Sequence, residues 1–228
     1  MELNTILVTG ANRGLGLEFA RSYAADGWRV HACCRHPEKA RELSAIAGDV
    51  VIHKLDVTDG LRVASLAREL ADERIDILIN NAGVFHAGND LGRVDYEDWV
   101  EELKVNTIAP ARMAERFVKQ IAASERKLIV NISSGLGSIA NTTSGESIVY
   151  RSSKAGLNMV AKCLSLAYAE RGITVVALSP GWVRTNMGGA NARLTPAESI
   201  AKMRKVIDRL TPADSGRFFN QDGEERPW

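Results

Sequence analysis

The chain has 228 residues, a formal net charge of +1 and 45% hydrophobic residues. This length is enough for a substantial core, so we predict one domain over residues 1–228 that needs neither disulfides nor a structural metal. The near-neutral charge argues against a nucleic-acid-binding protein and against attachment to an anionic membrane surface.

Apolar, β-rich segments alternate with helical patterns along the chain. Strands are predicted at 5–10, 29–35, 50–57, 75–83, 127–134 and 173–181, with a short seventh at 216–223. Helices are predicted at 15–26, 59–72, 97–123, 148–171 and 197–210. Strands that are apolar throughout suit a sheet covered on both faces, and strand–helix alternation implies parallel crossovers. The expected fold class is α/β: a Rossmann-like, doubly wound parallel sheet of about seven strands with helices on both faces.

Polar or glycine-rich segments follow six of these strands. In chain order they are "TGANRGLG", "CCRH", "LDVTD", "NNAG", "NISSG" and "SPGWVRT". Ligands of doubly wound sheets bind beyond the carboxyl ends of the strands. The sequence therefore predicts a ligand site at this edge.

The turn after the first strand carries Gly10, Gly14 and Gly16. Glycines permit a tight turn, and the following helix N-terminus offers free N–H groups to a pyrophosphate. The spacing G-x-x-x-G-x-G differs from the common G-x-G-x-x-G dinucleotide fingerprint. The strand–turn–helix context still favours a dinucleotide site.

Several further motifs occur in a characteristic order. They are "NNAG" (80–83), "VN" (105–106), "NISS" (131–134), Tyr150 with Lys154, and "PGWVRT" (180–185). Together with the glycine turn they resemble the short-chain dehydrogenase/reductase family over nearly the whole chain. "TNMGGANA" and the tail "GRFFNQDGEERPW" resemble its C-factor and sniffer-type carbonyl reductase branch.

The resemblance implies a nicotinamide cofactor. The cofactor-binding residues it implies are Gly10, Asn12, Arg13, Gly14, Leu15, Gly16, Arg35, Asp56, Val57, Asn81, Ala82, Gly83, Tyr150, Lys154, Pro180, Gly181, Val183 and Thr185.

The second strand bears on the choice between NADH and NADPH. NAD sites usually place an acid at its end, whereas here Cys34 stands there and Arg35 follows. Arg35, with Arg13 in the glycine turn, would favour a 2′-phosphate, so NADPH is expected over NADH. The alternative is that both arginines are solvated surface charges.

Asp56, with its neighbour Val57, looks like the residue that meets the adenine edge; alternatively Asp56 caps the helix that begins near Thr58 or Asp59. Asn80 is expected to tie neighbouring strands together, while Ala82 and Gly83 let the cofactor pass close to the backbone.

Tyr150 and Lys154 are four residues apart, so they share one helix face. A free tyrosine has a pKa of about 10, and a nearby ammonium and the positive nicotinamide ring are expected to lower it. Tyr150 would then exchange a proton with the substrate.

The resemblance assigns the remaining catalytic roles. Ser134 would hydrogen-bond the substrate oxygen, with Ser133 as the competing candidate, and Lys154 would also bond the nicotinamide ribose. Asn106 would steady a water beside the lysine; alternatively, it satisfies a backbone break in its helix. The implied reaction is hydride transfer to an aldehyde, ketone or quinone carbonyl, with Tyr150 protonating the oxygen.

Other expectations concern the surroundings. A substrate lid is expected over about 186–212, Trp182 is a pocket aromatic or a packing residue, and no metal is expected. Cys33, Cys34 and Cys163 suggest buried, reduced thiols in a cytoplasmic protein, and "MELNTILVTG" does not read as a signal peptide. The family pattern suggests a homodimer or homotetramer through 97–123 and 148–171. The alternative function is an NADP(H)-binding regulatory protein with incidental catalysis.

Overall fold

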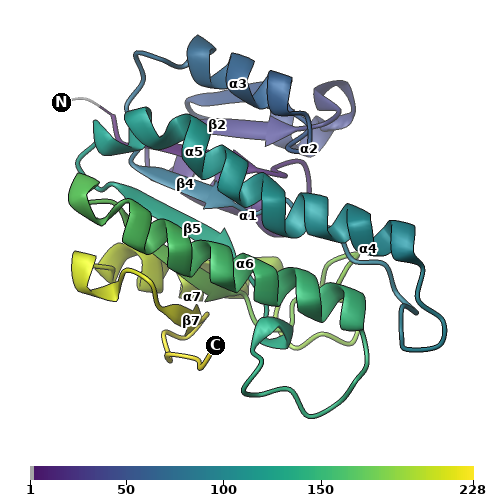
Figure 1. The fold of residues 1–228 in the computed structure, drawn as a ribbon. Helices are drawn as coiled ribbons and strands as arrows, with labels where there is room; N and C mark the ends of the chain where they lie inside the picture. The colour runs from purple at the N-terminus through teal and green to yellow at the C-terminus, as the bar shows by residue number, and fades with distance from the viewer. Residues whose placement is uncertain (1–2) are drawn as a thin grey trace.

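The computed structural model describes residues 3–228, which form a seven-stranded sheet between helical layers (Figure 1). The strand order is β3-β2-β1-β4-β5-β6-β7, and every adjacent pair is parallel. The Rossmann-like fold class is thereby confirmed. The strands are β1 (Thr5–Thr9), β2 (Arg29–Cys34), β3 (Val50–Lys54), β4 (Ile77–Asn80), β5 (Leu128–Ile132), β6 (Thr174–Ser179) and β7 (Phe218–Asn220).

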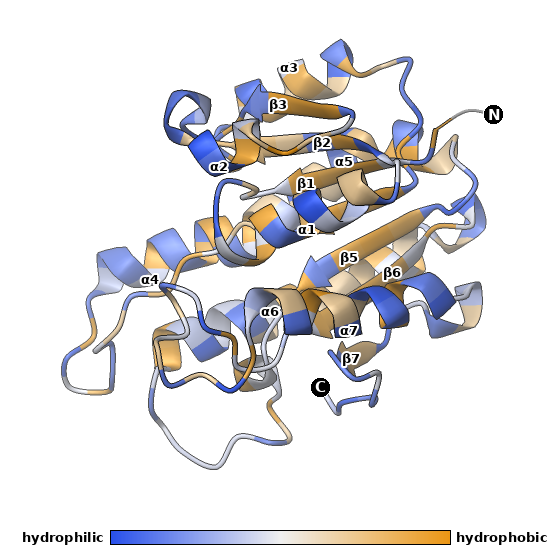
Figure 2. Cartoon of the chain, turned by 180° about the vertical axis from the view of Figure 1, so that it is seen from behind, coloured by the Kyte–Doolittle hydropathy of each residue, from blue (hydrophilic) through white to orange (hydrophobic). Residues whose placement is uncertain are grey.

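Helices cover both faces of the sheet. One face carries α1 (Gly14–Ala25), α2 (Arg41–Ser44) and α7 (Pro196–Arg209), and the other α3 (Gly60–Glu69), α5 (Ala109–Ala122) and α6 (Ile148–Ala167), as Figures 1 and 2 show from opposite sides. The helices on each face of the sheet cover a separate hydrophobic core. Phe19 and Met203 are fully buried in one of these cores and Phe117 in the other. Burying each such side chain contributes about 1.5–3 kcal/mol.

Three expectations need correction. The helix predicted over 97–123 is divided into α4 (Tyr96–Leu103), a π-helical turn at Lys104–Ile108, and α5. Pro110 has no N–H to bond the carbonyl four residues earlier, which favours a local change of helical pattern there. The third strand is an edge strand with Val51 39% exposed, so it is not buried on both faces. Cys163 is exposed, although Cys33 and Cys34 are buried.

The order of the strands reverses between β1 and β4. The chain runs outward from β1 to β2 and β3, and then crosses back to β4 on the other side of β1. Connections therefore leave β1 and β4 in opposite directions, and doubly wound sheets bind their ligands at the carboxyl ends of such strands. Within residues 3–228, no helix combines the length and apolar character needed to cross a bilayer.

Candidate active site

The glycine turn lies at this switch point and is closed tightly. Gly10 and Gly14 have φ of +66° and +57°, in the left-handed region. A Cβ at Gly16 would lie 2.2 Å from the Gly10 carbonyl oxygen, so a side chain there would force the turn open. A Cβ at Gly14 would lie 3.4 Å from Thr185 Cγ2, which places the segment after β6 against the turn.

The turn also presents an N-terminus suited to an anion. Arg13 is the N-cap of α1 and forms no side-chain capping hydrogen bond. The first N–H groups of α1 are left for another acceptor, as a pyrophosphate site requires. Asn12 and Arg13 are exposed, whereas Leu15 packs against the core.

The loop after β4 is fastened to the same turn. Asn81 Nδ2 donates to Thr9 O at 2.8 Å, and the Ala82 N–H donates to Thr9 Oγ1 at 3.0 Å. The Asn81 amide is thus bonded to the end of β1. Asn80 Nδ2 donates to Asn131 Oδ1 at 2.9 Å, which confirms the expected tie between neighbouring strands.

Arg35 and Asp56 line one pocket together with Thr58 and residues of α4 and the π-helical turn. Asp56 Oδ1 accepts hydrogen bonds from the Thr58 amide and hydroxyl, at 2.9 and 2.6 Å. Partial burial acts to raise the pKa of Asp56, but the Thr58 hydrogen bonds and nearby Arg35 lower it overall. The cap of α3 is Asp59, which removes the capping alternative for Asp56. Arg35 is exposed; Val57 is buried, and its carbonyl accepts from Arg112.

Tyr150 and Lys154 occupy successive turns of α6 and are 8% and 4% exposed. Lys154 Nζ lies 5.7 Å from the Tyr150 ring centroid and donates to Ile132 O at 2.9 Å. Ser134 is two residues beyond Ile132 in the chain, and its side chain interacts with the Tyr150 phenol. Ser133 instead donates to Asn158 Oδ1 at 2.6 Å and is buried, so the competing serine is turned away.

Asn106 joins this group from the π-helical turn. Its Oδ1 accepts from the Val84 N–H and its Nδ2 donates to Val84 O, both at 2.9 Å. Nδ2 also donates to Ser153 Oγ on α6 at 3.0 Å. Asn106 therefore satisfies backbone groups of the loop after β4 and none of its own helix. A Cβ at Gly83 would lie 3.2 Å from Asn106 Oδ1 and 3.7 Å from Lys154 Nζ, so Asn106 and Lys154 both approach the backbone of Gly83.

The pKa of the Tyr150 phenol differs from the expectation. Burial raises it above 10, while the interaction with Ser134 opposes the rise, so the expected lowering is not found in this structure. Burial lowers the pKa of Lys154 to about 8, and the negative charge of Glu102 counteracts part of that fall.

The segment after β6 lies close to Tyr150. The Tyr150 hydroxyl lies 3.9 Å from Met187 Sδ. Trp182 Nε1 donates a hydrogen bond to Gly188 O at 2.8 Å, which holds this loop together, although the Trp182 side chain is 53% exposed. Gly181 has φ +77°, the Pro180 carbonyl accepts from Ser199, and Val183 pairs with Leu194.

Sequence reasoning missed Phe85, His86 and Glu102. The Phe85 and Tyr150 rings meet edge to face, with centroids 5.1 Å apart. Glu102 is fully buried and precedes Asn106 by four residues. That spacing, an acid one turn before the asparagine, is the signal that would have drawn attention to it.

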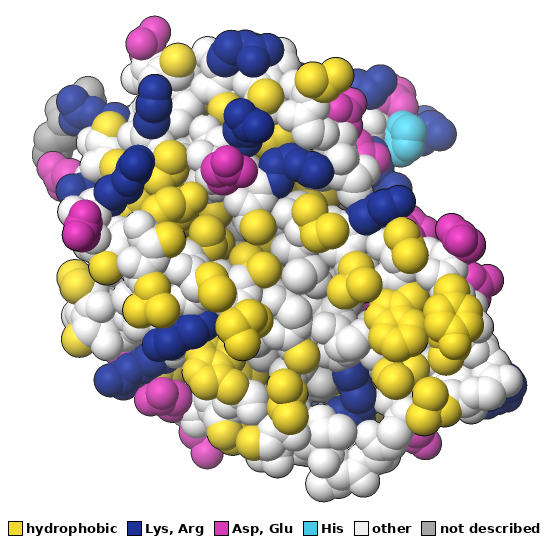
Figure 3. Space-filling model, in the orientation of Figure 1, with side chains coloured by type: hydrophobic (Ala, Val, Ile, Leu, Met, Phe, Trp, Pro, Cys, Tyr) yellow, Lys and Arg dark blue, Asp and Glu magenta, His cyan; other side chains and the backbone are white. Residues whose placement is uncertain are grey.

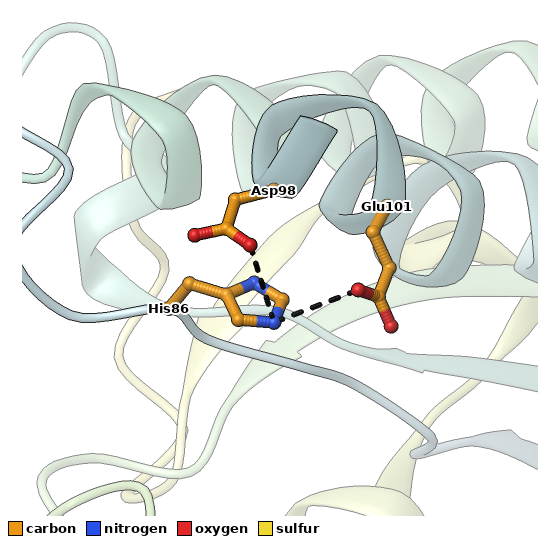
Figure 4. Close-up of side chains that lie close together, drawn as sticks. All are labelled: His86, Asp98 and Glu101. Carbon is orange, nitrogen blue, oxygen red and sulfur yellow. Dashed lines mark ion pairs between the residues drawn. The ribbon is translucent and has the colours of Figure 1, made fainter. Parts of the chain in front are cut away.

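His86 lies among carboxylates at the outer end of this loop (Figure 4). Asp98 and Glu101 approach His86 Nε2 at 3.9 and 3.6 Å, and each of the three offers a ligand atom within 4.8 Å of the others. The Glu101 side chain is half exposed, so this cluster is partly open to solvent.

Comparison with known proteins identifies the family. Residues 4–194 match the family model described as short chain dehydrogenase. C-signal of Myxococcus xanthus is 40% identical over 154 residues, which cover 68% of this chain and 93% of that protein. The structure of carbonyl reductase Sniffer of D. melanogaster aligns over 100% of both chains with a TM-score of 0.93 and 31% identity. NADPH-bound carbonyl reductase from chicken fatty liver aligns over 100% of both chains with a TM-score of 0.91 and 36% identity. The family match covers most of the chain and agrees with the glycine turn at the switch point and the tyrosine–lysine pair on α6. The chain belongs to the short-chain dehydrogenase/reductase family.

Proposed function

We propose that this protein is an NADPH-dependent carbonyl reductase that converts an aldehyde, ketone or quinone to the alcohol, with Tyr150 as proton donor. The observation that carries the proposal is that Asn106 and Lys154 both approach Gly83, while Tyr150 lies beside Lys154 on α6. The side chain of Ser134 interacts with the Tyr150 phenol. The NADPH bound to its chicken relative and the Arg35 guanidinium beside Asp56 support NADPH as cofactor.

The residues suit reduction. NADPH, when bound, supplies the hydride that reduces the carbonyl carbon. Because burial raises its pKa, Tyr150 is a neutral phenol at neutral pH and can donate a proton to the carbonyl oxygen. Ser134 donates a hydrogen bond to that oxygen and holds it beside the phenol. Lys154 would bond the nicotinamide ribose. Asn106 would steady a water beside Lys154, in a path that restores the proton on Tyr150. One carbonyl, one NADPH and one proton yield one alcohol and NADP⁺.

The direct test is NADPH consumption by the purified protein against a panel of aldehydes, ketones and quinones. At least one carbonyl class is expected to be reduced in proportion to enzyme concentration. NADPH binding without turnover of any of them would instead favour the second candidate, a regulatory protein that binds NADP(H). That candidate is supported by the similarity to C-signal over 68% of the chain.

The proposed assembly is a homodimer or homotetramer through the α4–α5 and α6 surfaces. Apolar side chains are exposed along these helices: Tyr96, Val100, Ile108, Met159 and Leu166. Figure 3 shows apolar side chains gathered on this side of the molecule. Light scattering after size exclusion tests the assembly. We also propose that residues 186–212, approximately, form a substrate lid and that the protein is cytoplasmic.

A further inference from the structure

His86, in the loop after β4, has carboxyl groups of α4 at both of its ring nitrogens. Asp98 Oδ1 and Glu101 Oε2 lie 3.9 and 3.6 Å from His86 Nε2, and Figure 4 shows both side chains reaching the imidazole from α4. Glu102 Oε1 lies 3.4 Å from Nδ1, the other ring nitrogen. One imidazole is thus placed among three acids.

The charges at Nε2 are not balanced by neighbouring side chains. Among residues 3–228, no lysine or arginine forms an ion pair with Asp98 or Glu101. A neutral imidazole has one N–H and one lone pair. When the proton is on Nδ1, beside Glu102, the lone pair of Nε2 faces two carboxylates. A proton or a metal ion on Nε2 would remove this repulsion.

The spacing of the donor atoms favours the metal ion. Charge-assisted N–H···O bonds are about 2.7–2.9 Å long. The two contacts of Nε2 are 3.9 and 3.6 Å, so neither is a hydrogen bond. Atoms that bind a tetrahedral zinc ion at about 2.0–2.1 Å lie about 3.4 Å from one another. His86, Asp98 and Glu101 each offer a ligand atom within 4.8 Å of the others, so a modest inward movement lets them share one ion.

Further side chains hold these donors in place. Glu102 is fully buried, and its Oε2 has no hydrogen-bond partner among the residues that the structure describes. Its Oε1 accepts from the His86 backbone N–H at 2.7 Å and lies beside Nδ1, which is buried as well. Histidines that bind zinc almost always donate their other ring N–H to a group such as this carboxylate. Asn89 Nδ2 donates to Asp98 Oδ2 at 2.9 Å, which leaves Oδ1 for the ion.

We propose that the imidazole of His86 and the carboxylates of Asp98 and Glu101 form a zinc site, with water completing the coordination. One nitrogen with two carboxylate oxygens suits Zn²⁺, whereas Mg²⁺ and Ca²⁺ prefer oxygen ligands alone. The sequence predicts no metal, because only the fold brings His86 to α4. Phe85, the residue before His86, packs its ring against Tyr150. The ion therefore braces a loop beside the candidate active site, and its binding does not depend on the proposed reductase function.

The test titrates the full, untagged chain with zinc chloride by calorimetry. All proteins carry Cys163→Ser, because the exposed Cys163 thiol is a competing zinc ligand. One ion per chain is expected to bind, and an equal concentration of Mg²⁺ should not displace it. His86→Gln should weaken zinc binding about a hundredfold or more, because it removes the nitrogen ligand. The matched control is His36→Gln, since His36 is exposed and lies 3.3 Å from a single carboxylate, Glu38; its zinc affinity should be unchanged.

Nitrogen NMR of protein labelled with ¹⁵N at histidine locates the ion, and the chain has only four histidines. Zinc should shift the signal of His86 Nε2, while Nδ1 keeps its proton. Should His86→Gln fail to fold, Glu101→Gln decides, because this half-exposed side chain is expected to tolerate the change. It should weaken zinc binding about tenfold or more.

The proposal is overturned by zinc affinities that are equal in the Cys163→Ser protein and in His86→Gln, or by an absence of zinc binding. Zinc that shifts the signals of His31 and His53 and leaves those of His86 unchanged would also overturn it. Protons on both His86 nitrogens at saturating zinc would show that a proton balances the carboxylates. Neither measurement needs cofactor or substrate, so a protein that binds zinc at His86 but reduces no carbonyl would remove the reductase function and leave the zinc site standing.

Discussion

Acidification from about pH 7.5 to about pH 5 is expected to destabilise the folded protein through a histidine pair on β2 and β3. His31 Nδ1 lies 3.0 Å from His53 Nε2, and the His31 side chain is only 3% exposed. Burial is the main cause that lowers the pKa of His31 from 6.5 to about 4, and the positive charges of His53 and Arg29 add to it. The carboxylates of Asp49 and Glu73 lie nearby, and Asp49 opposes the effect.

The sign follows from proton uptake. Below the unfolded pKa of 6.5, the unfolded chain binds a proton at His31 that the folded protein does not bind until the pH approaches 4. The stability that neutral His31 contributes is therefore present above pH 6.5 and is lost as the pH falls toward 4. At 1.36 kcal/mol per pKa unit, the full loss is about 3 kcal/mol, of which about 2 kcal/mol is lost by pH 5.

Urea denaturation at about pH 7.5 and about pH 5 measures this loss. In His31→Gln the fall in unfolding free energy between the two pH values should be smaller than in the wild type by about 2 kcal/mol. The control is His36→Gln, because the His36 side chain is 62% exposed. The unfolding free energy of this variant should change between the two pH values as much as that of the wild type. An identical pH dependence in wild type and His31→Gln would refute the reasoning.

Two further substitutions test the cofactor site. In Arg35→Asp, the ratio of kcat/KM with NADPH to kcat/KM with NADH should fall by about tenfold or more, because charge-assisted bonds to the 2′-phosphate would be lost. An unchanged ratio would mean that Arg35 is only a solvated charge. Gly16→Ala places a Cβ 2.2 Å from Gly10 O, and should cost about 1–3 kcal/mol of unfolding free energy and weaken NADPH binding. Gly145→Ala, where a Cβ meets nothing within 4 Å, should behave as wild type; equal behaviour of the two variants would contradict the account of the turn.

The sheet and the glycine turn could be predicted because their signals are local. Continuous apolar runs such as Ile6–Val8 mark buried strands, and the glycine turn begins at Gly10, directly after the strand that contains this run. The same pattern overestimated the burial of β3, because a strand's place at the sheet edge depends on the order of the other strands.

The environment of the site could not be predicted because it depends on residues brought together from separate segments. The π-helical turn places Asn106 in hydrogen-bonding distance of Val84, and Pro110 is the sequence feature that we associate with this turn. The hydrogen bond from Ser133 to Asn158 joins β5's end to α6, a contact between separate segments that the sequence alone does not reveal. Charged neighbours alone predict a lowered pKa for Tyr150, whereas its burial, which depends on the packing of separate segments, raises the pKa.

Tyr150→Phe tests the central claim most directly, because it removes the proton donor and keeps the ring that packs against Phe85. Carbonyl turnover and NADPH affinity, the latter from NADPH fluorescence, should be measured on the same preparation. Turnover is expected to fall by about a hundredfold or more, while NADPH affinity stays close to that of the wild type. Substantial residual turnover in this variant would contradict the assignment of Tyr150 as the proton donor.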